Sequence, residues 1–210
     1  MKTRVFNLII LDESGSMQSI KKEAIDNVNE TVQTIRSAEQ ENENQEHFIS
    51  LITFNNEVKT VYDCVPAVEV REFSSKTYHP NRCTALYDAM GMSLNALRPK
   101  VTEEDRILVT VVTDGYENAS REYSSEAIKA LVDELKKEGW VFAYIGANQN
   151  VERTAATISI TNTMVFHTTS EGTQNMTQSV NRSRKKFFAR LSDVSFNSAV
   201  ENECFFDDEE

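Results

Sequence analysis

Residues 5–16 read VFNLIILDESGS, a run of large apolar side chains that stops abruptly at Asp12 and continues into a short polar turn. An apolar run without alternating polar positions is typical of a central strand that is covered on both faces. Ser14 and Ser16 follow Asp12 at alternate positions. The sequence therefore predicts oxygen-bearing side chains at the carboxyl end of a buried strand.

Strand-like and helix-like patterns alternate along the rest of the chain. Predicted strands occupy residues 5–11, 47–54, 58–62, 107–112, 140–145 and 164–166, and predicted helices residues 20–38, 84–98, 124–138, 151–158 and 173–191. Residues 55–57 (NNE) indicate a hairpin, and hence an antiparallel edge strand. We predict an α/β fold: a doubly wound, mainly parallel central sheet with one antiparallel edge strand and helices on both faces. Residues 1–192 form one domain in this prediction, and residues 193–210 an acidic, partly disordered C-terminal tail.

Composition narrows the classes of partner. The 210 residues include 22 basic and 33 acidic side chains, for a net charge of −11. Such a balance disfavours nucleic acid and anionic membranes as partners, because both would repel the protein. No apolar segment approaches the roughly 20 residues that cross a bilayer, and residues 5–11 are too short for a signal peptide. The scattered Cys64, Cys83 and Cys204 indicate reduced thiols, so we expect a cytoplasmic protein; the sequence predicts no oligomeric state.

Three segments bring the same chemistry to predicted strand ends and helix starts. Asp12, Ser14 and Ser16 follow the first strand, Thr84 opens a predicted helix, and Asp114 follows the strand at residues 107–112. In an open α/β sheet, binding residues gather beyond the carboxyl ends of the strands. All five side chains offer oxygen, which suits Mg²⁺, a cation that needs six ligands and usually keeps some water. Five such groups leave a coordination position for an outside ligand.

Asp-x-Ser-x-Ser after an apolar strand, a later Thr, and Asp-Gly after another strand resemble the metal-ion-dependent adhesion site of von Willebrand factor A domains. The resemblance covers about residues 4–168, and all five motif positions match. It implies that Ser14, Ser16 and Thr84 ligate Mg²⁺, with Mn²⁺ or Ca²⁺ as alternatives, through their hydroxyls. Asp12 and Asp114 would act directly or through water, and an Asp or Glu of a partner protein would complete the coordination sphere.

The resemblance also has finer features. Residues 143–149 (AYIGANQ) are similar to a bacterial subfamily of stand-alone A domains, and switching by a shift of the last helix is implied. Arg82 and Cys83 stand before Thr84, where this group often has glycine. The departure removes no ligand but alters the loop or the partner preference.

Several alternatives accompany this interpretation. The serine-rich turn alone would also suit a helix N-cap. In a further alternative, the bound metal only stabilises the fold. A Mg²⁺-dependent phosphatase or phosphotransferase would use Asp12 as nucleophile. Such an enzyme normally needs a second acid at position 14 as the general acid, and that residue is Ser. We therefore predict a non-enzymatic protein–protein interaction module with no catalytic residue. Glu13 and Glu117 are interpreted as solvated surface acids, Cys83 as a loop thiol, and residues 182–186 (RSRKK) as a solvated helix face.

Overall fold

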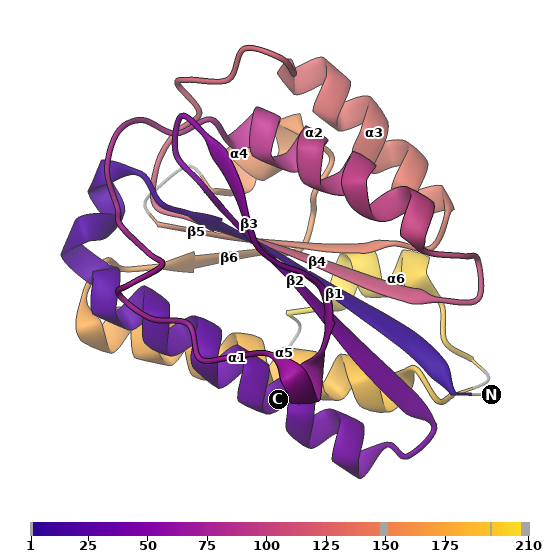
Figure 1. Cartoon of the computed structure of the whole chain (residues 1–210). Helices are drawn as coiled ribbons and strands as arrows, with labels where there is room; N and C mark the ends of the chain where they lie inside the picture. Colours follow the sequence, from indigo (N-terminus) through magenta and orange to yellow (C-terminus); the bar gives the residue numbers. More distant parts are fainter. Residues whose placement is uncertain (1, 148–150, 194, 207–210) are drawn as a thin grey trace.

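The computed structural model describes residues 2–147, 151–193 and 195–206, and six strands in these ranges form one sheet (Figure 1). The strands are β1 (Thr3–Asp12), β2 (Gln45–Phe54), β3 (Val58–Pro66), β4 (Arg106–Thr113), β5 (Val141–Ala147) and β6 (Thr163–Phe166). The helices are α1 (Lys21–Glu41), α2 (Leu86–Leu97), α3 (Ser125–Lys137), α4 (Val151–Thr157), α5 (Ser170–Arg190) and α6 (Ser198–Cys204).

The sheet has the order β3-β2-β1-β4-β5-β6, with β1 near the centre. Every neighbouring pair is parallel except β2 and β3, which meet through the hairpin at residues 55–57. The predicted fold class, a mainly parallel sheet with one antiparallel edge strand, is confirmed. Because β1 pairs with both β2 and β4, the carboxyl ends of these three strands lie side by side.

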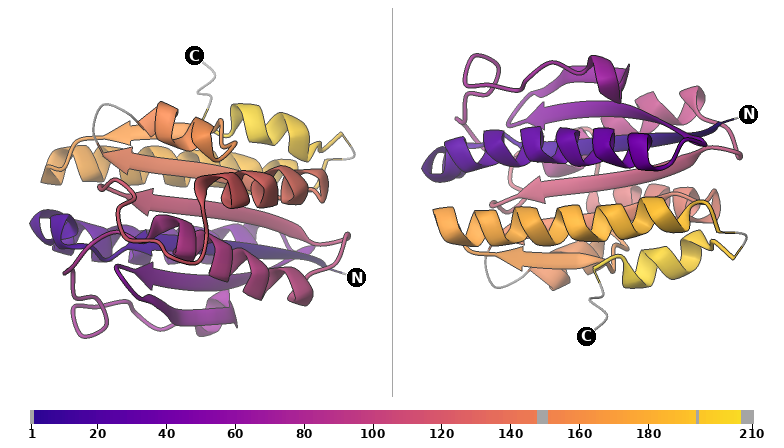
Figure 2. Two further views of the ribbon diagram at one scale, coloured as in Figure 1. Left: turned by 90° about the horizontal axis from the view of Figure 1, so that it is seen from above. Right: turned by 90° about the horizontal axis from the view of Figure 1, so that it is seen from below.

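Helices cover both faces of the sheet (Figure 2). Helices α1 and α5 lie on one face, whereas α2, α3 and α4 lie on the other. Alternate residues of β1 enter the two cores: Val5 and Ile9 pack with the α1 and α5 side chains, and Phe6 and Leu8 with those of α2 and α3. Each fully buried side chain of this size contributes about 1.5–3 kcal/mol, so β1 is an anchor for both layers.

The C-terminal segment differs from the sequence-based expectation. Residues 198–204 form α6, which contacts β5 and α3. The Asn202 side chain donates to the Trp140 carbonyl at 2.8 Å and accepts from the Phe142 amide at 3.0 Å, and Phe205 is buried. Residues 195–206 are therefore part of the domain rather than a separate tail, because hydrogen bonds and a buried aromatic ring fix them. Residues 207–210 lie outside the described ranges.

The basic stretch 182–186 on α5 is not uniformly solvated, which corrects the expectation. Arg184 is only 1% exposed and points at the sheet. Its Nη2 donates to Thr110 Oγ1 at 3.0 Å and its Nη1 to Thr31 Oγ1 at 3.2 Å, so it joins α5 to β4 and α1. Burial lowers the pKa of Arg184 to about 10, which leaves the guanidinium charged at neutral pH.

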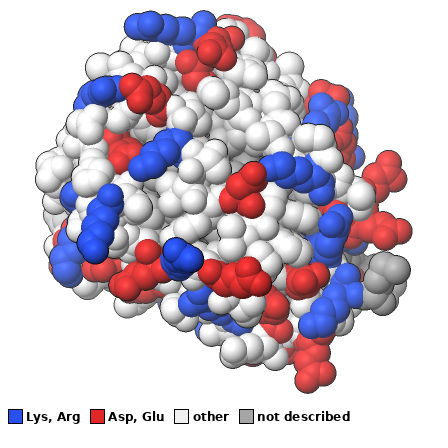
Figure 3. Space-filling view, in the orientation of Figure 1, with Lys and Arg blue, Asp and Glu red and all other residues white. Residues whose placement is uncertain are grey.

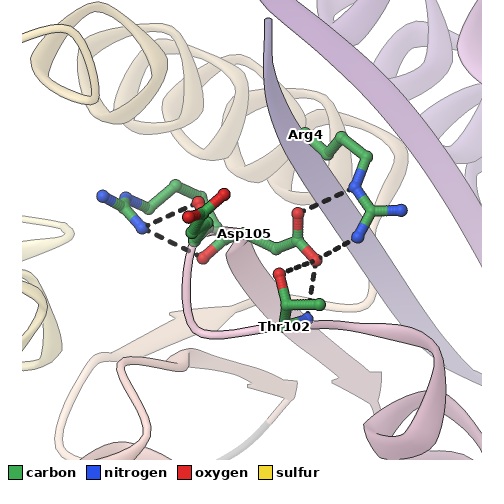
Figure 4. Close-up of polar contacts among 5 residues, drawn as sticks. Arg4, Thr102 and Asp105 are labelled. Atoms are coloured by element: carbon green, nitrogen blue, oxygen red, sulfur yellow. Dashed lines mark hydrogen bonds and ion pairs between the residues drawn. The ribbon is translucent and has the colours of Figure 1, made fainter. Parts of the chain in front are cut away.

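Charged side chains of both signs are interspersed over the face shown in Figure 3. Among the described helices, none is both long enough and apolar enough to span a bilayer. At the beginnings of β1 and β4, one buried carboxylate has a full set of partners (Figure 4). Asp105 accepts from Arg4 Nε at 2.9 Å and Nη2 at 2.5 Å, and from the Thr102 amide at 2.7 Å.

Candidate metal centre

The five predicted site residues lie at the carboxyl ends of β1 and β4. Asp12 is the last residue of β1, and Asp114 follows β4 directly. These positions are adjacent because Leu11 and Val112 are paired across the two strands. Ser14 and Ser16 lie at the start of the 3-10 helix that leads into α1, and Thr84 lies two residues before α2.

Hydrogen bonds connect four of these residues. Asp12 Oδ1 accepts from the Ser14 amide at 2.7 Å, and Asp12 Oδ2 accepts from Thr113 Oγ1 at 2.6 Å. The hydroxyls of Ser14 and Ser16 are 3.1 Å apart, and the Ser16 hydroxyl donates to Asp114 Oδ1 at 2.6 Å. Both carboxylates are thus oriented by neutral donors, with lone pairs left over.

The fifth residue, Thr84, lies beside the space next to Gly115. A Cβ atom at Gly115 would lie 2.9 Å from Thr84 Oγ1, 3.6 Å from Asp12 Oδ2 and 3.7 Å from Ser16 Oγ. Oxygens from two separate segments, residues 12–16 and Thr84, therefore surround a space that a methyl group on Gly115 would fill. We call this space, with Asp12, Ser14, Ser16, Thr84 and Asp114 around it, the oxygen cradle.

The cradle contains two carboxylates and no basic side chain of the described residues that pairs with them. Asp12 is fully buried, and burial raises its pKa to about 6 although hydrogen bonds from Thr113 and Ser14 act in the opposite direction. Burial also raises the pKa of Asp114. Within the described residues no lysine, arginine or histidine forms an ion pair with either carboxylate. Two partly desolvated negative charges without a cation are costly, and a divalent ion would relieve that cost.

The donor set limits which ion fits. The described residues contain no cluster of three or more His, Cys, Asp or Glu side chains, so hydroxyls would have to complete any site here. Such a set excludes the sulfur-rich and imidazole-rich environments typical of zinc. Hard oxygen ligands with two formal charges fit Mg²⁺, Mn²⁺ or Ca²⁺.

The sequence matches a model of a known protein family, and the fold matches solved structures. The family model of the von Willebrand factor type A domain matches residues 8–182, which is most of the chain and includes all five cradle residues. The chain belongs to this family. A search of curated proteins finds no match to the sequence of this A domain.

Solved structures share the fold of this A domain at low sequence identity. The PilB minor pilin from Streptococcus sanguinis has a TM-score of 0.63 at 10% identity, over 92% of this chain and 64% of that chain. The chain thus spans less than two thirds of the pilin. BatB from Bacteroides thetaiotaomicron gives 0.55 at 15%, over 87% and 98%. The vWF domain of the type V pili tip protein Mfa5 from Porphyromonas gingivalis gives 0.57 at 12%, over 87% and 96%.

The departure before Thr84 has a structural explanation in this A domain. Arg82 adopts φ = +65°, a left-handed conformation that glycine enters at little cost. Its side chain pairs with Glu57, and its carbonyl accepts from the Gly15 amide at 3.0 Å. Arg82 thus preserves the backbone shape that glycine would give. Cys83 is exposed, in keeping with its interpretation as a loop thiol.

Two acids near the cradle have roles other than those expected. Glu13 is buried and its carboxylate accepts from the His79 amide, so it ties the loop after β3 to the site. Glu117 accepts from the backbone amides of Ala119 and Ser120 at 2.9 and 2.7 Å. Both are therefore structural acceptors and not solvated surface acids. The segment 143–149, on which the expected likeness to a bacterial subfamily rests, ends in Asn148 and Gln149, which lie outside the described residues.

Proposed function

We propose that this A domain is a non-enzymatic protein–protein interaction module that binds one divalent cation in the oxygen cradle. Mg²⁺ is the preferred ion, with Mn²⁺ or Ca²⁺ as substitutes. Asp12, Ser14, Ser16, Thr84 and Asp114 would hold it, and an Asp or Glu carboxylate of a partner protein would take the open coordination position. The observation that carries the proposal is that Asp12, Ser16 and Thr84 oxygens surround the space at Gly115, while Ser14 and Asp114 are hydrogen-bonded to Ser16 beside it. No basic side chain of the described residues pairs with either carboxylate.

The exposure of the cradle residues indicates where a partner would approach. Asp12, Ser14 and Thr84 are buried, whereas Ser16 is exposed and Asp114 is half-buried. Only the side formed by Ser16 and Asp114 is open to solvent. An ion in the cradle would therefore present its remaining position outward, where a macromolecular carboxylate can reach it.

The buried position of Asp12 disfavours the phosphatase alternative. A nucleophilic carboxylate must reach its substrate, and Asp12 is fully buried with both oxygens accepting hydrogen bonds. Position 14 supplies a hydroxyl in place of the general acid that this chemistry needs. We propose instead that Asp12 acts as an oriented acceptor in the metal centre.

The names of similar structures support an interaction role, since PilB is a minor pilin and Mfa5 a pilus tip protein. For the cellular setting, we propose a reducing compartment such as the cytoplasm. Cys64 and Cys83 are free thiols, and a compartment that keeps thiols reduced suits them.

Calorimetric titration of Mg²⁺ and Mn²⁺ into chelator-stripped protein tests the metal site. We expect one binding site in the wild type, and its loss in Asp12→Ala and in Asp114→Ala, with the fold intact by circular dichroism. Asp63→Ala is the matched control, because it removes an exposed acid that pairs with Lys100. Equal binding in both site variants, or no binding by the wild type, would contradict the proposal.

Docking of a carboxylate has its own test. In Mn²⁺-loaded protein, acetate should displace metal-bound water and lower the relaxation rate of solvent protons, whereas acetamide should not. If the rate is insensitive to acetate while Mn²⁺ stays bound, the ion has a structural role and the docking function is wrong.

A further inference from the structure

Residues 117–123, which we call the strap, run from the cradle along α2. At its first residue, Glu117 Oε2 accepts from the Tyr87 amide at 3.0 Å and from the Ser120 hydroxyl at 2.7 Å. Glu117 Oε1 accepts from the amides of Ala119 and Ser120. One carboxylate thus receives four donors and joins the strap to an otherwise unsatisfied amide in the first turn of α2.

The strap is anchored a second time, farther along α2. Asp88 Oδ1 accepts from the amides of Glu122 and Tyr123, both at 2.9 Å, and Asp88 Oδ2 from the Arg121 amide at 2.8 Å. The Tyr123 ring lies against Gly91, where a Cβ atom would approach it to 2.5 Å. Each segment therefore supplies the other with a carboxylate, Glu117 from the strap and Asp88 from α2, and both are fully engaged with backbone donors.

Thr84, one of the cradle residues, is also bonded to the strap. Its amide donates to Asn118 Oδ1 at 2.9 Å, and its carbonyl accepts from the Asn118 amide at 3.0 Å. Thr84 precedes α2, and its backbone is held from both sides by one strap residue. Glu117 is three residues from Asp114 in the chain and bonds Tyr87, which is three residues from Thr84. The Glu117 contact therefore links the two segments that carry Asp114 and Thr84.

We infer that Glu117 is the positioning residue of the metal centre: it sets the location of Thr84 Oγ1 relative to Asp114 without touching the ion. The inference rests on the proposed metal-binding function. Acceptors of this kind around a metal site often change metal affinity by about 10- to 100-fold when they are removed. The geometry gives Glu117 this role because its four donors come from the start of α2, which follows Thr84, and from the strap, which follows Asp114.

The experiment compares metal affinity in Glu117→Gln, Thr84→Ala and the double variant. Glu117→Gln keeps the size of the side chain but places an NH₂ group against backbone donors. We expect it to weaken Mn²⁺ binding by about 10-fold or more. In the Thr84→Ala background the same substitution should lower Mn²⁺ affinity by less than a further factor of about 2. Thr84→Ala and Glu117→Gln should both add metal-bound water, measured by solvent proton relaxation.

Asp105→Asn supplies the matched control, since Asp105 is also a carboxylate with several donors but lies at the opposite end of the strands. It should lower the midpoint of urea unfolding and leave metal affinity unchanged. If Glu117→Gln does not fold, Ser120→Ala removes a single donor to Glu117 and should weaken binding in the same direction.

The outcomes separate the two proposals. Wild-type binding with unchanged affinity in Glu117→Gln, or equal losses in the wild-type and Thr84→Ala backgrounds, would overturn the positioning role and leave the metal-binding function standing. Absence of binding in the wild type would overturn both. A loss of affinity in Asp105→Asn that matches the loss in Glu117→Gln would show that general destabilisation, and not positioning, lowers the affinity.

Discussion

The two ends of the β1–β4 strand pair place buried carboxylates in opposite electrostatic settings. At the amino ends, Asp105 is matched by the Arg4 guanidinium through two hydrogen bonds (Figure 4). At the carboxyl ends, Asp12 and Asp114 receive hydrogen bonds from neutral hydroxyls and amides, and no basic side chain of the described residues pairs with them. The same pair of strands therefore has a neutralised end and an end that lacks positive charge.

This difference separates a carboxylate that is paired within the fold from the two carboxylates for which we propose a bound cation. A buried acid with its own cation is complete within the chain, and removing it leaves an unpaired partner. Buried acids without a cation are a net cost to the free protein, and a cost of this kind is retained where function needs it. The comparison predicts opposite responses at the two ends.

The largest expected effect is a loss of stability at low pH. His47 on β2 pairs with Val5 near the amino end of β1, and burial lowers its pKa to about 4. In the unfolded chain His47 takes up a proton near its ordinary pKa of about 6.5. The contribution of His47 to the free energy of unfolding is therefore complete above that pH. It falls as the pH drops towards 4 and changes little below, with a loss of up to about 3 kcal/mol.

Urea unfolding of the wild type and His47→Gln between pH 5 and 7.5 measures this dependence. The variant should show a shallower decline over the same window, because glutamine has no proton to gain. Parallel curves for the two proteins would exclude His47 as the source of the acid sensitivity.

The next effect belongs to the carboxyl ends. Metal at about 100 times its dissociation constant should add about 2.7 kcal/mol to the free energy of unfolding, and a chelator should reverse the change. Thermal unfolding with and without Mg²⁺ measures it. Asp114→Asn should lose the metal response and Asp105→Asn should retain it; the reverse pattern would contradict the assignment of the two ends.

A somewhat smaller effect is expected at the amino ends. Asp105→Asn should cost about 1–3 kcal/mol, because it leaves Arg4 and the Thr102 amide with a poorer acceptor. Arg4 is partly exposed, so water compensates in part. The midpoint of urea unfolding reports the change, and a neutral result would mean that the ion pair contributes little.

The smallest effect is the most informative about the cradle. Asp114→Asn, measured without metal, should change the free energy of unfolding by no more than about 0.5 kcal/mol, or stabilise the protein, because it removes an uncompensated charge and keeps an acceptor for Ser16. A loss as large as that of Asp105→Asn would show that Asp114 serves the fold.

Much of the fold follows from local pattern. The apolar run at residues 5–11 predicts a doubly covered strand, and β1 supplies side chains to both cores. The site motif has the same origin, since residues after parallel strands meet at one edge, and the structure brings all five predicted residues together. Their ligation of a metal remains a prediction.

Long-range polar contacts escape such patterns. The role of Asn202 depends on the Trp140 and Phe142 backbone, and that of Glu117 on the Tyr87 amide. Neither partner is visible from local composition. Arg184 did carry a signal: it lies four residues after Val180 and three before Phe187, on the apolar side of α5. Helical spacing outweighs charge there.

Gly115 contributes to the site through what it lacks. A methyl group at this position would stand 2.9 Å from Thr84 Oγ1, inside the space that the oxygens surround. Replacing Gly115 with alanine would keep every predicted ligand in the chain, but it would press on Thr84 Oγ1 and occupy the room proposed for the ion. The alanine variant would therefore distinguish the hydrogen bonds that the oxygens make with one another from the binding of a cation by the same oxygens.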